Sequence, residues 1–164
     1  MYITTKWKSS VKTIKPENMQ VPFHYSGKIF FNHVDVNPSI KQKKQLKIWI
    51  ENCIQKEGYR LGELSYNFCS DEQLLEININ HLNHNFYTDI ITFELNEDNI
   101  VVGDVYISID RVKDNAEQNQ TTFTNELHRV IIHGVLHLCG YKDKSNKEAA
   151  TMRQKEDYYL SLLK

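Results

Sequence analysis

Two histidines, His133 and His137, stand four residues apart in the stretch His133-Gly-Val-Leu-His137-Leu-Cys-Gly-Tyr-Lys-Asp143. Because successive helix residues are rotated by about 100°, the two imidazoles lie only about 40° apart on one helix face. Gly140 predicts the end of that helix, since glycine adopts the left-handed C′ conformation at little cost. The chain then turns, so Asp143 can fold back toward the imidazoles. These three side chains predict a metal site with an open coordination position, as in catalytic zinc centres.

The residues around the two histidines bear on this prediction. A histidine pair alone is a weak indication, since such pairs are often surface residues or hydrogen-bonded core residues. This helix is strongly apolar, however, and imidazoles among apolar side chains are costly without partners. Residue 134 is glycine, so the chain lacks the HExxH motif, whose glutamate is the general base of zinc proteases. Gly134 supplies no base, but it allows another element to pack closely against the helix.

The composition indicates a protein with a single domain that resides in a reducing compartment. A chain of 164 residues suits a single domain with a sizeable core. Its three cysteines form no CxxC pair and fit reduced thiols, and Cys139 is expected to point into the core rather than to ligate metal. No apolar run is long enough for a membrane span, and the first residues lack the apolar region of a secretory signal. We therefore expect a cytoplasmic protein without a membrane partner.

Residues 25–164 are expected to form the domain, and residues 1–24 an extension or a loosely docked strand. Apolar alternation and turn residues predict strands over 28–36, 63–69, 89–95 and 100–109. Helical spacing and capping residues predict helices over 37–58, 70–82, 111–118, 122–139 and 145–164. The last two strands form a hairpin, which makes part of the sheet antiparallel. The fold class is therefore α+β: a small mixed β-sheet packed with helices, with the metal site at the end of a long helix.

Three blocks of the sequence resemble the YbeY family, the metal-dependent endoribonucleases of rRNA maturation. The segment HGVLHLCGYKDK, residues 133–144, resembles the family signature HGxLHLxGYDH. Ile77-Asn78 and Thr88–Phe93 resemble a second block, LN…TDVLSF, and Gly103-Asp104-Val105 resembles the family's GDI segment. The order and spacing of the blocks match, and the resemblance covers about residues 28–160.

This resemblance implies an endoribonuclease for single-stranded RNA that matures the 3′ end of small-subunit rRNA and serves ribosome quality control. His133, His137 and Asp143 would bind one Zn²⁺ per chain, or another divalent metal, and act in catalysis through water that the metal activates. The partners implied are rRNA and the small ribosomal subunit. Two alternatives stay open: a ribosome-assembly factor whose metal is mainly structural, and a metal-dependent hydrolase of another substrate. Three evident ligands favour the enzyme, because closed structural zinc sites use four.

The chain departs from the family pattern at two positions. Asp143 stands where the family's commonest third ligand is a histidine, which gives a two-histidine, one-carboxylate set that suits zinc and other divalent metals. Leu82 stands where many members carry an arginine thought to serve the RNA phosphate, and leucine makes no charge-assisted contact. Phosphate contact must therefore come from elsewhere or be weaker.

Several charged residues could serve either in function or only in solubility and local structure. Lys142 and Lys144 flank Asp143 and either contact RNA phosphates or keep the loop soluble; with residues 83–88 they are expected to line the pocket at the open position. Asp104 is either inward and functional or a turn carboxylate. Glu126 returns to the face of His133, but about 10 Å along the axis. It is therefore expected to be a solvated helix-start residue.

The remaining polar residues carry weaker indications. His128 lies about 140° around the helix from His133, so no ligand role is expected. His81 and His84 are expected to be solvent-exposed. The formal net charge of −1 does not indicate nucleic-acid binding. Four lysines near one helix start form either a solvated face or a phosphate-binding stripe: Lys41, Lys43, Lys44 and Lys47. The native metal, the general base and the oligomeric state stay open.

Overall fold

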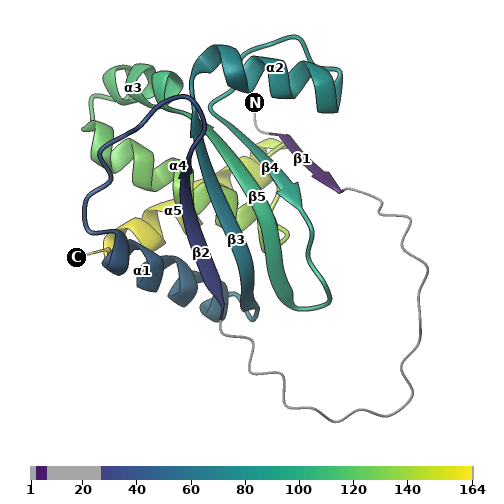
Figure 1. Ribbon diagram of the computed structural model, residues 1–164. Coiled ribbons are helices and arrows are strands. Elements are labelled where there is room, and N and C mark those ends of the chain that lie inside the picture. The colour runs from purple at the N-terminus through teal and green to yellow at the C-terminus, as the bar shows by residue number, and fades with distance from the viewer. Residues whose placement is uncertain (1–2, 7–26, 164) are drawn as a thin grey trace.

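A computed structural model describes residues 3–6 and 27–163 of the protein (Figure 1). Within these residues, the strands of one five-stranded sheet are β1 Ile3–Lys6, β2 Lys28–His33, β3 Arg60–Cys69, β4 Ile90–Glu94 and β5 Ile100–Ser108. They lie side by side in the order β1-β4-β5-β3-β2. β4 and β5 are antiparallel, whereas the other neighbouring pairs are parallel. The sheet is therefore mixed, as the sequence predicted.

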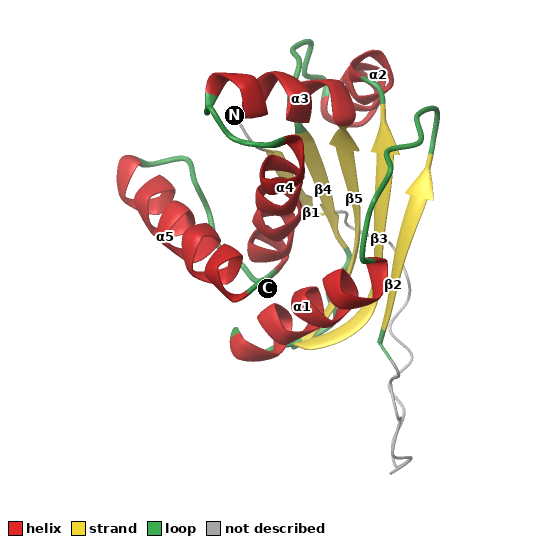
Figure 2. Ribbon diagram, turned by 90° about the vertical axis from the view of Figure 1, so that its left-hand side faces the viewer, coloured by secondary structure: helices red, strands yellow, loops and turns green. Residues whose placement is uncertain are grey.

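Helices pack on both faces of this sheet. Their bounds are α1 Lys43–Lys56, α2 Asp71–Leu82, α3 Ile109–Gln118, α4 Phe123–Leu138 and α5 Asn146–Leu162. Figure 2 shows α1, α4 and α5 on one face. On the other face, Leu74 of α2 clusters with Cys69 and Ile91. No helix in the described ranges is both long enough and apolar enough to cross a membrane.

The helix α4 lies directly on the central strands and is buried along most of its length. Successive strand residues point to opposite faces, so Ile90 lies in the larger core with α4, while Ile91 lies in the small cluster with α2. A Cβ atom at Gly134 would lie 2.9 Å from Cδ1 of Ile90 and 3.1 Å from Cγ1 of Val105. The missing side chain thus allows the close packing that the sequence predicted.

The three cysteines are free thiols and lie on both sides of the sheet. Cys53 and Cys139 belong to the larger core, whereas Cys69 belongs to the cluster beneath α2. All three are buried. The expected core position of Cys139 is confirmed.

The α+β fold class is confirmed, and so is the capping box that opens α5. Ser145 Oγ accepts from the Glu148 N–H, and the Glu148 carboxylate accepts from the Ser145 N–H. Of the expected N-terminal extension, the described part is β1, which pairs in parallel with β4. The rest of that extension lies outside the described residues. Strand and helix ends mostly fall within three residues of prediction.

The predicted start of the first helix at Asn37 is wrong, because α1 begins at Lys43. The intervening segment is irregular, and in it the Ile40 N–H donates to the Pro38 carbonyl at 2.9 Å. Gln42 then adopts a left-handed conformation with φ 52° and makes no side-chain cap. Asparagine followed by proline is typical of turns as well as of helix starts, so the same pattern fitted both.

Candidate metal centre

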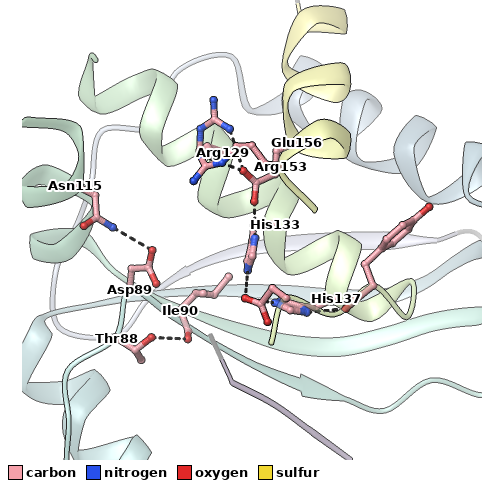
Figure 3. Close-up of polar contacts among 11 residues, drawn as sticks. Thr88, Asp89, Ile90, Asn115, Arg129, His133, His137, Arg153 and Glu156 are labelled. Carbon is pink, nitrogen blue, oxygen red and sulfur yellow. Dashed lines mark hydrogen bonds and ion pairs between the residues drawn. The ribbon is translucent and has the colours of Figure 1, made fainter. Parts of the chain in front are cut away.

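His133 and His137 lie in the second half of α4 (Figure 3). The loop after the helix brings Asp143 back to them. Gly140 makes this turn with a φ of 89°, the left-handed conformation that the sequence predicted. Asp143 Oδ2 lies 3.9 Å from Nε2 of His133 and 3.8 Å from Nε2 of His137. One donor atom from each residue fits within 4.8 Å of the others. The structure therefore brings the three predicted ligands into one cluster.

Each histidine is held by its other ring nitrogen, which directs Nε2 into the cluster. His133 Nδ1 lies 2.6 Å from Oε1 of Glu156, and His137 Nδ1 lies 2.9 Å from the main-chain oxygen of Tyr141. Because both partners are acceptors, Nδ1 carries the proton and donates in each case. The lone pair of Nε2 then faces Asp143, as metal-ligating histidines require.

Glu156, on α5, contacts a predicted ligand, and sequence reasoning missed it. Its carboxylate accepts from Arg129 Nη1 at 2.9 Å, and Arg153 Nη1 lies 3.6 Å away. Burial opposes ionisation of Glu156, but the hydrogen bond with His133 and the nearby arginines outweigh burial and lower the pKa of the carboxyl. Glu156 is therefore an anion that fixes the orientation of His133.

Tyr141 is anchored by a second buried carboxylate, Glu57, at the end of α1. The Tyr141 hydroxyl donates to Glu57 Oε2 at 2.7 Å, and Lys155 Nζ donates to Oε1 at 2.8 Å. The Tyr159 hydroxyl donates to the same Oε1. Three helices, α1, α4 and α5, thus meet around the loop whose carbonyl holds His137.

The donor set fits a divalent cation. Burial, followed by the neighbouring His133, lowers the pKa of His137 to about 4, so this imidazole is neutral at neutral pH. Neutral imidazole is the form that ligates metal. Two imidazole nitrogens and one carboxylate oxygen suit zinc, and they also suit other first-row divalent metals. The group of His133, His137 and Asp143 could hold a metal ion.

A surface hollow reaches the cluster at His137. Its lining includes Lys142 and Lys144, both exposed, together with Tyr59 and Asn96. The two lysines therefore line the same hollow as His137, whereas His133 and Asp143 are not part of its lining. Residues 83–88 do not line this hollow. They lie instead at the opposite end of β4, just before Ile90.

Two acidic residues, Asp104 and Glu126, are not part of the cluster. Asp104 shares the sheet face of Tyr106, which packs against the cluster beneath α2, so it faces away from α4. The expected solvation of Glu126 is wrong: the residue is only 4% exposed. It lies seven residues before His133 on the buried face of α4, and that face is covered from the first turn onward.

The other histidines do not join the cluster. His128 is partly buried, with its ring centroid 6.1 Å from that of Trp49. His81 is exposed as predicted, but the prediction for His84 is wrong, because this side chain is half-buried and stacks on Phe86. Leu82, at the position of the family arginine, packs against the cluster beneath α2.

The lysines at the start of α1 are exposed, with Lys47 Nζ 5.7 Å from the centroid of the Phe31 ring. This arrangement agrees with a solvated helix face on which one ammonium group lies over an aromatic ring. It places no lysine of α1 in the hollow beside His137.

The chain is similar to known proteins over most of its length. A sequence model of the family Endoribonuclease YbeY matches residues 31–164. The chain is 50% identical over 137 residues to an Endoribonuclease YbeY of Cytophaga hutchinsonii, a match that covers 83% of this chain and 96% of that protein. It is 48% identical over 126 residues to one of Parabacteroides distasonis, covering 77% and 88%. The solution structure of a Thermotoga maritima protein is similar, with a TM-score of 0.60 and 28% identity over 83% of this chain and 89% of that one. This chain therefore belongs to the Endoribonuclease YbeY family.

Proposed function

We propose that this protein is a metal-dependent endoribonuclease whose cation, zinc in the first place, is held by His133, His137 and Asp143. The observation that carries the proposal is the convergence of two Nε2 atoms on one carboxylate, with both Nδ1 atoms already bonded to acceptors. A divalent cation held there supplies Lewis acidity, which activates water and stabilises charge on a phosphodiester.

The protein's own residues prepare this chemistry. Glu156 and the carbonyl of Tyr141 orient the two imidazoles. Lys142 and Lys144, at the mouth of the hollow, attract the phosphates of the substrate backbone. The described residues offer three clustered donors, which leaves a coordination position for water or substrate and favours an enzyme over a closed structural site.

The substrate that we propose is single-stranded rRNA, cleaved during maturation of the 3′ end of small-subunit rRNA and in ribosome quality control. The small ribosomal subunit in the cytoplasm would be the partner. Family membership supports the nuclease activity. The second candidate, an assembly factor with a structural metal, predicts metal binding without turnover.

Cleavage of a single-stranded RNA by wild-type protein and by the His137→Ala variant tests the proposal. We expect loss of cleavage together with loss of metal, measured by elemental analysis of protein purified without chelator. His128→Ala is the matched control, since His128 lies on the same helix outside the cluster. Undiminished cleavage by His137→Ala would remove the metal from the mechanism. A zinc-loaded wild-type protein that cleaves no RNA would favour the assembly factor.

A further inference from the structure

The loop between α2 and β4, residues 83–88, presents aromatic rings to solvent. Phe86 is 37% exposed and Tyr87 is 48% exposed. The ring of His84 stacks on that of Phe86, with centroids 5.2 Å apart and planes 25° apart. The loop contains no lysine or arginine. We call residues 83–88 the aromatic loop. Its exposed rings suit contact with planar partners rather than with phosphate.

The aromatic loop is held in place from beneath. Asn83 ends α2 in the left-handed conformation, and its N–H donates to the Ile79 carbonyl at 3.1 Å. The Asn78 side chain donates to the Phe86 carbonyl at 2.8 Å. The backbone that carries the two rings is therefore preorganised, so little conformational entropy is lost when a partner binds.

Arg111 fixes the second ring. Its guanidinium carbon lies 4.8 Å from the centroid of Tyr87, a cation–π distance. The same guanidinium bonds to Asp71, with Nη2 2.8 Å from Oδ2. Because Asp71 pairs with this guanidinium, Arg111 is held in place against the Tyr87 ring.

The aromatic loop and the two lysines lie at opposite ends of β4, the strand next to the candidate metal centre. Tyr87 precedes Ile90 by three residues, which span at most about 10 Å. Ile90 lies under Gly134, the neighbour of His133. At the other end of the strand, Glu94 lines the same hollow as His137, Lys142 and Lys144. The rings, the helix segment that carries His133, and the lysines therefore follow one another in this order along β4, so one single-stranded substrate could contact all three.

We propose that the aromatic loop is the base-stacking subsite for single-stranded RNA, with Phe86 and Tyr87 as the stacking rings. This inference rests on the proposed nuclease function and names its recognition surface. Stacking on aromatic side chains accepts any base, because every base has a π-face. The arrangement also accounts for a chain of net charge −1 that has leucine at residue 82, since affinity comes from stacking as well as from phosphate contacts.

Kinetics of the metal-loaded protein test the subsite. We expect Phe86→Ala and Tyr87→Ala each to raise KM for a single-stranded RNA about tenfold with kcat nearly unchanged. Tyr87→Phe should restore the wild-type KM, since phenylalanine stacks equally well. Tyr158→Ala is the control, because Tyr158 is also 48% exposed but lies on α5. Both alanine variants should bind metal normally.

Binding measurements separate stacking from charge. In a His137→Ala background, which prevents cleavage, a short oligouridylate carrying 2-aminopurine should lose fluorescence when its base stacks on the rings. Removal of either ring should abolish this loss and leave the salt dependence of binding unchanged. Lys142→Ala should lower the slope of log K against log salt by about one.

Unchanged KM and 2-aminopurine fluorescence in both ring variants, with an active wild-type protein, would overturn the subsite and leave the nuclease proposal standing. Loss of association with the small ribosomal subunit, with unchanged RNA parameters, would assign the loop to a protein partner and overturn it as well. Failure of the nuclease proposal itself shows separately, as an inactive wild-type protein or an active His137→Ala variant.

Discussion

The main-chain oxygen of Tyr141 lies 2.9 Å from Nδ1 of His137, and the hydroxyl of the same tyrosine donates to Glu57. Tyr141 therefore links the predicted metal ligand His137 to the carboxylate of Glu57, which lies 80 positions before His137 in the chain. Any residue at position 141 would offer a main-chain carbonyl to His137. The tyrosine hydroxyl adds a hydrogen bond to Glu57 at the end of α1. The ring orientation of His137 thus depends on how α1 and α5 pack.

Tyr141→Phe removes the hydroxyl and keeps the carbonyl. We expect zinc affinity, measured by competition with a chromophoric chelator, to fall by up to about tenfold, the lower range for residues that support metal ligands. Tyr158→Phe, at an exposed position of α5, should not change it. Unchanged affinity in Tyr141→Phe would show that the loop holds His137 without Glu57.

Glu156→Ala leaves His133 Nδ1 and Arg129 without their shared carboxylate. We expect metal affinity to fall about 10- to 100-fold and metal-dependent cleavage to fall with it. Asp157→Asn is the matched control: Asp157 Oδ1 also lies 2.9 Å from Arg129 Nη1, but this carboxylate does not contact His133. Equal losses in both variants would assign the effect to Arg129 rather than to the orientation of His133.

Glu57 should make the metal-free protein sensitive to acid. Burial opposes ionisation of Glu57, but hydrogen bonds from Lys155, Tyr159 and Tyr141 outweigh burial and lower the pKa of the carboxyl. A carboxyl whose pKa is lowered in the folded state stabilises the protein at any pH above its unfolded pKa of about 4.3. This stabilisation is lost as the pH falls through the lowered pKa of the folded state. Between about pH 5 and 3, urea unfolding should therefore show a steeper loss of stability in wild-type protein than in Glu57→Gln. Parallel curves would contradict this assignment.

Gly134→Ala should strain the contact between α4 and the sheet. Overpacking costs about 1–3 kcal/mol, and the greater helix propensity of alanine offsets about 1 kcal/mol. Ile90→Val removes the Cδ1 atom that would lie 2.9 Å from the new methyl group. The double variant should therefore lose less stability than the sum of the two single variants, measured by urea unfolding. Strictly additive losses would show that the helix yields without strain.

The sequence was enough to predict the cluster of His133, His137 and Asp143, but not the residues that orient the two histidines. The two histidines, Gly140 and Asp143 lie within eleven consecutive residues, where helix geometry fixes the histidine pair and the glycine turn returns the chain toward it. Glu156 lies 23 positions beyond His133 on another helix, and its contact depends on the angle at which α5 crosses α4. The role of the Tyr141 carbonyl cannot be read from the sequence, since every residue has a main-chain carbonyl.

Local patterns likewise predicted helix caps better than helix starts near turns. Ser145 and Glu148 satisfy each other's backbone groups, so their spacing carries a physical requirement. Asn37 and Pro38 meet the requirements of both a turn and a helix start, so the local sequence does not decide between them. Glu126 was misjudged for a related reason, because burial of a helix face depends on elements that the helix itself does not specify.

The distribution of the cysteines over both faces of the sheet gives the protein two built-in reporters of partial opening. Burial raises the pKa of Cys69 and of Cys139 to about 12, so neither thiol reacts at neutral pH while it stays covered. Modification of Cys69 requires α2 to lift from the sheet, whereas modification of Cys53 or Cys139 requires the larger core to open. The rates at which a thiol reagent labels these positions therefore measure the opening free energies of the two layers separately, without any engineered cysteine.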